Sequence, residues 1–221
     1  MSGEQTQAIE STGISRRRKA LTLGLVIASA GIAYSARHYR AIASAPSPQI
    51  LLELPKFQLT TEHGTGFANH SLAGHAWVAN FIFTSCTQTC PKLTARMVDL
   101  QTELGKTDKG RRIRLLSITV DPETDTPAVL AAYASKNGAD PTRWSFLTGD
   151  ATAVKDVVMN GFKMTIQRTE LDAGAYDILH GNWFALGDAR GYVRGFEQVE
   201  TTEDARRMAA AILTLEGEGS R

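Results

Sequence analysis

Short apolar runs alternate along this chain with segments in which apolar residues recur every three or four positions. The runs at residues 76–83 (AWVANFIF) and 113–120 (IRLLSITV) are too short for typical helices and predict strands buried on both faces. Between them, apolar residues from Leu93 to Leu104 follow a helical spacing that starts after Pro91. The pattern therefore predicts a β–α–β unit, whose two strands pair in parallel.

Similar signals divide the rest of the body into short elements. They predict strands at 51–54, 57–61 and 145–147, helices at 127–136, 151–160 and 201–215, and a hairpin of 183–186 with 192–196. The order is ββ, then βαβαβα, then ββα. This order predicts an α/β domain of the thioredoxin-like class, with a central mixed sheet flanked by helices.

The N-terminal segment has a different character. Residues 20–36 (ALTLGLVIASAGIAYSA) are uncharged and span about 25 Å as a helix, the short limit for crossing a bilayer. Four basic residues precede this run and two arginines follow it, which favours an N-terminus on the inside. We expect a cytoplasmic tail, a transmembrane anchor or uncleaved signal, a linker and a thioredoxin-like domain, at 1–19, 20–36, 37–50 and 51–221.

This organisation predicts a single-pass protein of a bacterial-type inner membrane, with its domain in the periplasm. Two alternatives remain open at this point. Ala43-Ser44-Ala45 resembles a signal-peptide cleavage site, and Arg17-Arg18 resembles a twin-arginine export signal. Both alternatives also carry the domain out of the cytosol.

Composition narrows the class of function. With 43% hydrophobic and 21% charged residues in 221, the chain is neither disordered nor a polytopic membrane protein. The net charge of +1 hides an asymmetry, because residues 51–221 hold 18 basic and 21 acidic side chains. A body with a net charge of −3 argues against a nucleic-acid-binding surface. Two cysteines are too few for a disulfide-rich scaffold.

The two cysteines, Cys86 and Cys90, lie where the first buried strand gives way to a helix. Backbone N–H groups and the helix dipole stabilise a thiolate at such a position. A four-residue offset brings two sulfurs to one side of a first helical turn, close enough for a disulfide or a shared metal ion. A structural disulfide or two incidental thiols remain alternatives. Thiolates favour Cu(I) or Zn(II), often with histidine as a third ligand.

Histidine and acidic residues offer further candidates near this turn. His180 precedes the hairpin strand, in a loop that faces the cysteine turn in a thioredoxin-like layout. His63, His70 and His75 are expected at the surface, and His38 beside the membrane.

Two aspartates follow the second buried strand. Asp121 lies at its end, where open parallel sheets place functional loops, and its role stays open. Either Asp125 or Thr126, which precede Pro127, is expected to cap the helix that starts there.

Several of these motifs together resemble the Sco/SenC family of membrane-tethered, thioredoxin-like copper proteins. The matching stretches are FIFTSCTQTCPKLT, SITVDPETDTPAVLAAYA, RWSFLTGD and the histidine before WFALGDARGYV. The resemblance implies Cu(I) held by Cys86, Cys90 and His180, with a Cys86–Cys90 disulfide in the oxidised form, and leaves the binding of Cu(II) open.

The resemblance also implies a function and partners. A Sco protein delivers copper to the binuclear copper centre of cytochrome c oxidase, or keeps the cysteines of that centre reduced. The implied partners are the copper-containing oxidase subunit, a thioredoxin-like reductant and another copper chaperone. The chain departs from the family pattern at three positions: Thr87 replaces a proline, Leu179 an aspartate, and Gly181 a serine or threonine.

Three functions are therefore compared. The first is a copper chaperone that uses all three ligands. The second is a thiol–disulfide oxidoreductase, the one enzymatic option, which needs only Cys86 and Cys90. Against it, the cysteine spacing differs from that of thioredoxin, and residues 170–190 contain no proline. The third is a sensor or a non-catalytic partner of a respiratory complex. A structural zinc site is disfavoured, because the sequence offers no fourth ligand.

Overall fold

The structure is a computed structural model that describes residues 49–87, 89–170, 176–179 and 181–218. All of these residues belong to one compact unit, Ser47–Arg221. The expected anchor at 20–36 lies outside them. Within the described ranges, none of the helices is both long enough and apolar enough to cross a membrane.

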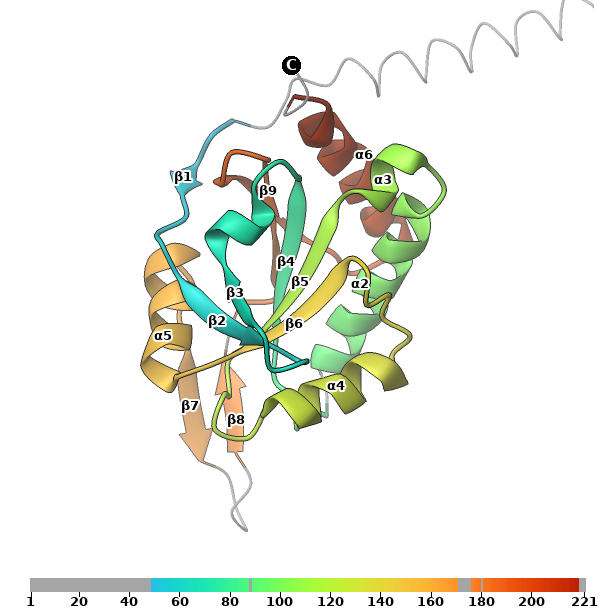
Figure 1. Cartoon of the computed structure of the whole chain (residues 1–221). Helices are drawn as coiled ribbons and strands as arrows, with labels where there is room; N and C mark the ends of the chain where they lie inside the picture. Colours follow the sequence, from blue (N-terminus) through green and yellow to red (C-terminus); the bar gives the residue numbers. More distant parts are fainter. Residues whose placement is uncertain (1–48, 88, 171–175, 180, 219–221) are drawn as a thin grey trace, which may run out of the picture. The chain divides into compact units, whose positions relative to one another are not determined.

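Ten strands and several helices build this unit (Figure 1). The strands are β1 (Leu52–Glu53), β2 (Gln58–Thr61), β3 (Gly66–Ala68), β4 (Trp77–Ile82), β5 (Arg114–Thr119), β6 (Trp144–Thr148), β7 (Gln167–Glu170), β8 (Tyr176–Leu179), β9 (Trp183–Gly187) and β10 (Tyr192–Gln198). The helices are η1 (Asn69–Leu72), α2 (Cys90–Leu104), α3 (Asp108–Arg111), α4 (Pro127–Lys136), α5 (Ala151–Asp156), η2 (Val157–Gly161) and α6 (Thr202–Glu218).

Eight of the strands form one mixed sheet in the order β1-β10-β9-β4-β5-β6-β2-β3. Its centre is parallel: β4 pairs with β5, and β5 pairs with β6. The outer strands β9, β10, β1, β2 and β3 are antiparallel to their neighbours. The predicted α/β class with a mixed sheet is confirmed, and the carboxyl ends of β4 and β5 lie side by side.

Strand β4 is buried along its whole length because both faces of the sheet are covered. On one face, Trp77 and Phe81 make edge-to-face contacts with Phe162, with ring centroids 6.0 and 5.0 Å apart. On the other face, Asn80 accepts a hydrogen bond of 2.7 Å from the Ser117 hydroxyl of β5. This two-sided burial explains why the strand reads as a continuous apolar run.

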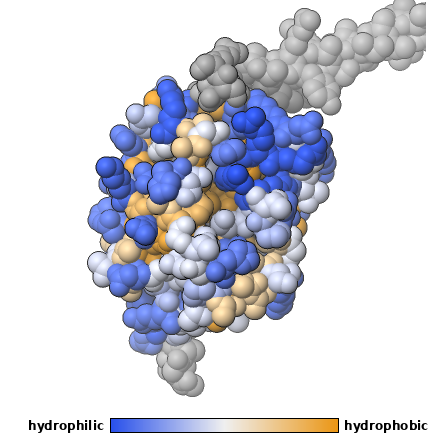
Figure 2. Space-filling model, viewed as in Figure 1, coloured by the Kyte–Doolittle hydropathy of each residue, from blue (hydrophilic) through white to orange (hydrophobic). Residues whose placement is uncertain are grey.

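Helices cover the sheet on two sides. α2 contacts β4 and α6, α4 contacts β6, and α5 contacts β2. Figure 1 shows α2 and α6 to the right of the central strands and α5 to their left. The face in Figure 2 has a largely hydrophilic rim around an apolar area. In the described ranges, the exposed large apolar side chains are Ile50, Leu51, Val129 and Trp183.

Sequence periodicity located most of these elements, and α4 has the predicted ends. One predicted helix is shorter than expected: the α-helix at 151–160 ends at Asp156 and continues as the π-helical turn η2. The sequence predicted none of β3, η1, α3 and the two strands of the β7–β8 hairpin. The hairpin forms a separate two-stranded sheet. In β7 every residue is exposed, so the strand carries no hydrophobic alternation.

Candidate metal centre

The two cysteines lie at the carboxyl end of β4, at the start of α2. The Cys86 N–H donates to the Phe83 carbonyl oxygen at 3.2 Å, which closes a tight turn after the strand. Cys90 is the first residue of α2, and its N–H donates to the Cys86 Sγ at 3.4 Å. The Cys86 sulfur therefore accepts a hydrogen bond from the first turn of α2. This is the environment that stabilises a thiolate.

The two thiols differ in their exposure to solvent. Cys86 is partly exposed, whereas the Cys90 side chain is fully buried and belongs to the hydrophobic core. Burial raises the pKa of the Cys90 thiol far above its usual range, and the neighbouring Cys86 and Asp125 raise it further. An incoming reactant or metal ion thus reaches Cys86 before Cys90.

Asp125 belongs to this site, and of the two residues expected to cap α4 it is not the one that does so. Its buried carboxylate accepts hydrogen bonds from the Thr84 N–H at 3.1 Å, from the Thr84 hydroxyl and, at 2.6 Å, from the Thr119 hydroxyl. Thr126 alone caps α4, accepting from the Val129 N–H. Asp125 therefore anchors the turn that carries Cys86. Burial raises the pKa of this carboxyl, although its hydrogen-bond donors oppose the shift.

Asp121, whose role the sequence left open, is buried next to the same turn. Its carboxylate accepts a hydrogen bond from the Tyr176 phenol at the start of β8. The Tyr176 oxygen also lies 3.3 Å from the Ser85 hydroxyl, one residue before Cys86. Thus the β7–β8 hairpin, which the sequence did not predict, contacts the cysteine turn. In Figure 1 the hairpin lies at the lower end of the sheet, where α2 begins.

His180, the third predicted ligand, lies outside the described residues. Its described neighbours are Leu179, the last residue of β8, and Gly181. A Cβ atom on Gly181 would lie 2.9 Å from the Trp183 ring and 3.5 Å from the Met164 sulfur. This close packing explains why the chain has glycine here. Gly181, Trp183 and Met164 also line a mainly apolar cavity of about 510 Å³.

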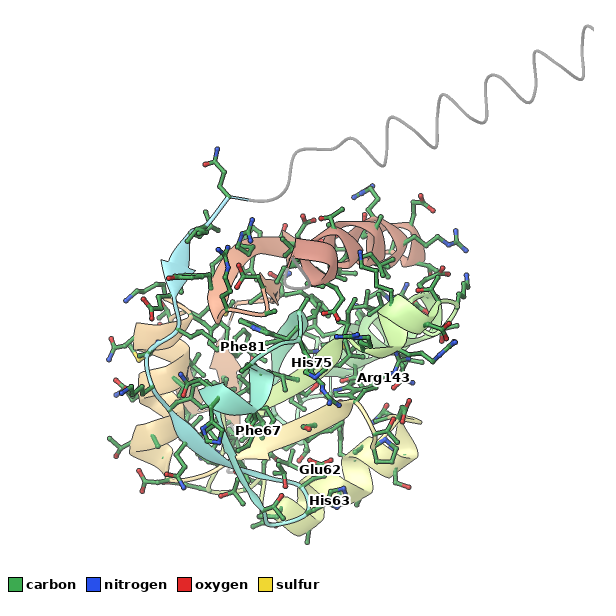
Figure 3. The ribbon with its side chains drawn as sticks, turned by 45° about the horizontal axis from the view of Figure 1, so that its top comes forward. Glu62, His63, Phe67, His75, Phe81 and Arg143 are labelled. Atoms are coloured by element: carbon green, nitrogen blue, oxygen red, sulfur yellow. The ribbon has the colours of Figure 1, made fainter. Side chains whose placement is uncertain are left out.

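The other histidines of the domain lie away from the cysteine turn. His63 follows β2, is 62% exposed and lies 3.5 Å from Glu62 (Figure 3). His75 precedes β4, at the opposite end of that strand from Cys86. His70 is exposed on η1. Within the described ranges, no group of three or more histidine, cysteine or acidic side chains is arranged to hold a metal ion.

Comparison with known proteins assigns the family. The SCO1/SenC family model matches residues 48–215. A SCO1 protein homolog of Bacillus subtilis is 32% identical over 152 residues, which cover 68% of this chain and 76% of the relative. The chain therefore belongs to the SCO1/SenC family.

Solved structures agree with this assignment. The copper-bound ScoI of Bradyrhizobium japonicum superimposes with a TM-score of 0.63 at 26% identity, covering 72% of this chain and 98% of its own. BsSco, described as a Sco-family cytochrome c oxidase assembly protein with a disulfide switch, has a TM-score of 0.63 at 28% identity. That likeness covers 76% of this chain and 96% of BsSco. These likenesses show that the domain has the α/β fold of Sco structures, with a mixed sheet flanked by helices.

Proposed function

We propose that this chain binds Cu(I) through Cys86, Cys90 and His180 and delivers it to the binuclear copper centre of cytochrome c oxidase. The observation that carries the proposal is the placement of the Cys86 sulfur over the first turn of α2, beside Cys90 and the hairpin that leads to His180. Copper-bound and oxidase-assembly relatives support the same function.

The donor set fits a copper cargo. Two thiolates are soft ligands that select Cu(I), and a single imidazole completes a site of low coordination number. The pKa of the buried Cys90 thiol is raised, so copper binding must release its proton. An open coordination sphere lets a client cysteine displace the protein ligands one at a time, with no net redox change.

Leu179 stands where the family pattern has an aspartate before the histidine, and Asp177 is the acidic residue of β8. Asp177 is exposed, and its Oδ1 accepts a hydrogen bond of 2.9 Å from the N–H of Ile178. One oxygen of that carboxylate therefore bonds within β8. Partners that orient the copper ligands are important for metal affinity. We infer that the imidazole of His180 is oriented by the hairpin rather than by a neighbouring acid.

The proposal includes a location and a set of partners. Residues 20–36 anchor the chain in a bacterial-type inner membrane, and the domain faces the periplasm. The copper-containing oxidase subunit is the client. Another copper chaperone supplies the cargo, and a thioredoxin-like protein keeps Cys86 and Cys90 reduced, because oxidising compartments otherwise join such pairs.

Anaerobic Cu(I) titration of the reduced full-length chain against a competing chelator tests the proposal. We expect one tightly bound equivalent, with affinity lowered at least about tenfold by Cys86→Ala, Cys90→Ala or His180→Ala. His63→Ala is the control, since this exposed imidazole lies away from the cysteine turn. Binding that none of the three ligand substitutions alters would contradict the proposal.

The unequal burial of the two thiols favours thiol–disulfide exchange as a second candidate function. In this reaction the Cys86 thiolate attacks a client disulfide and forms a mixed disulfide. The Cys90 thiolate then attacks Cys86, so the client leaves with two thiols and the chain holds a Cys86–Cys90 disulfide. Full reduction of a client disulfide by the His180→Ala variant would favour this candidate over copper delivery.

A further inference from the structure

The Tyr176 phenol connects three segments that are far apart in the sequence. Its hydroxyl donates to the Asp121 carboxylate, in the loop that follows β5. The same oxygen lies 3.0 Å from the Thr124 hydroxyl in that loop and 3.3 Å from the Ser85 hydroxyl in the cysteine turn. One side chain of β8 therefore bonds to both loops at the carboxyl ends of the central strands.

The Tyr176 ring is held as well as its hydroxyl. It stacks on Phe83, with ring centroids 6.4 Å apart and an angle of 26° between the planes. The Arg168 guanidinium of β7 lies over the same ring, 3.8 Å from its centroid. The Arg168 Nη1 is also 4.0 Å from the Asp121 carboxylate. The hydrophobic and polar contacts thus fix one orientation of the side chain.

These contacts are important because the hairpin lacks a place in the main sheet. Among the strands that the structure describes, β7 and β8 pair only with each other, from Gln167 opposite Leu179 to Glu170 opposite Tyr176. A lone two-stranded hairpin is marginally stable in water. Its position against the domain therefore depends on side-chain contacts. His180 is the residue that immediately follows this hairpin in the sequence.

We propose that Tyr176 is a positioning residue for copper binding: its phenol fixes the β7–β8 hairpin on the cysteine turn and so sets where His180 meets the two thiols. This inference rests on the proposed function. A ligand held in place before the metal arrives loses less conformational freedom on binding, so a firmly held hairpin strengthens affinity.

The first test separates positioning from a general structural role. Tyr176→Phe keeps the aromatic stack and removes the hydroxyl. In the full-length chain we expect Cu(I) affinity to fall about tenfold. In the His180→Ala background we expect Tyr176→Phe to have no further effect, because the residue acts through His180. An equal loss in both backgrounds, or no loss in the parent, would overturn the inference.

Tyr192→Phe is the matched control. Like Tyr176, Tyr192 has an arginine over its ring: the Arg190 guanidinium lies 5.5 Å from the ring centroid. Tyr192 is the first residue of β10, and the next residue in that strand pairs with Gly187 of β9. Gly187 pairs in turn with Trp77, at the end of β4 remote from Cys86. The control should leave Cu(I) affinity unchanged. A loss equal to that of Tyr176→Phe would show that removing any phenol hydroxyl weakens binding, and would overturn the inference.

A second readout uses the metal-free protein, so that it remains informative if the proposed function fails. Amide hydrogen exchange in β7 and β8 should be about tenfold faster in Tyr176→Phe, with β4 and β5 unchanged. If the parent chain has no affinity for Cu(I), the proposed function is refuted. The hydrogen-exchange rates of β7 and β8 still test whether Tyr176 holds the hairpin in that case. Unchanged exchange in the hairpin would overturn the inference by itself.

Discussion

The carboxylate of Asp125 holds the turn at Thr84, 41 residues earlier in the chain. It accepts hydrogen bonds from both the backbone N–H and the hydroxyl of Thr84, two residues before Cys86. Asp125 itself lies directly before the cap of α4. The loops after β4 and β5 are thus joined through one buried carboxylate, and the position of the cysteine turn depends on it.

Replacement of Asp125 by alanine should destabilise the domain. The substitution removes the acceptor for three buried or partly buried donors of Thr84 and Thr119, so we expect a loss of about 3 kcal/mol in the free energy of unfolding. Denaturant unfolding measures it. The control is Asp150→Ala, which removes the exposed cap of α5 and should cost about 1 kcal/mol. Equal losses in the two variants would contradict the anchoring role of Asp125.

The pH dependence of stability gives a second test of the same carboxylate. Burial raises its pKa in the folded state above the ordinary value of 3.8. A raised pKa means that the part of the stability linked to protonation of Asp125 is complete below about pH 3.8 and is lost as pH rises through the folded-state pKa. Asp125→Asn does not titrate. The free energy of unfolding of the parent, minus that of this variant, should therefore decrease as the pH is raised above 4. A difference that stays constant with pH would contradict a raised pKa for Asp125.

Alkylation kinetics test the inequality of the two thiols. Because burial raises the pKa of Cys90, its thiolate is scarce and shielded at pH 8, whereas Cys86 is partly exposed. The Cys86→Ser variant, which keeps only Cys90, should react with iodoacetamide at least about tenfold more slowly than Cys90→Ser. Mass spectrometry follows the label. Equal rates in the two variants would show that Cys90 is not protected.

The packing of β9 on β4 predicts a sharp contrast between two glycines. A Cβ atom on Gly187 would lie 1.8 Å from the Trp77 ring, whereas one on Gly195 would have Leu186 as its nearest neighbour at 3.9 Å. Gly187→Ala should therefore cost about 3 kcal/mol in unfolding free energy. Gly195→Ala should change it by less than about 0.5 kcal/mol. Thermal or denaturant unfolding of both variants checks this, and similar stabilities would refute the predicted clash.

Local signals explain how much of the fold the sequence could predict. The apolar runs predicted β4 and β5. Thr126-Pro127 signalled where α4 begins and Asn137-Gly138 where it ends, and the helix has these ends in the structure. Such elements are determined by nearby residues. The β7–β8 hairpin carries no comparable signal, because all four residues of β7 are exposed and polar. The π-helical turn after Asp156 likewise depends on packing rather than on periodicity.

The candidate site was predictable only in part, for the same reason. The position of Cys86 and Cys90 at a strand-to-helix junction follows from local sequence. The roles of Asp125 and Tyr176 depend on contacts with Thr84 and Ser85, across 41 and 91 residues. Asp125 also lies just before a helix, where an aspartate commonly acts as the N-cap. Its position in the sequence therefore suggested capping and gave no sign of the hydrogen bonds to Thr84.

X-ray absorption at the copper edge is the most direct test of the central claim, that Cu(I) is held by Cys86, Cys90 and His180. The reduced full-length chain, loaded with one equivalent of Cu(I), should show two sulfur ligands and one nitrogen ligand. The His180→Ala variant should lose the nitrogen and keep both sulfurs. A parent site without nitrogen, or a nitrogen that persists in His180→Ala, would contradict the account.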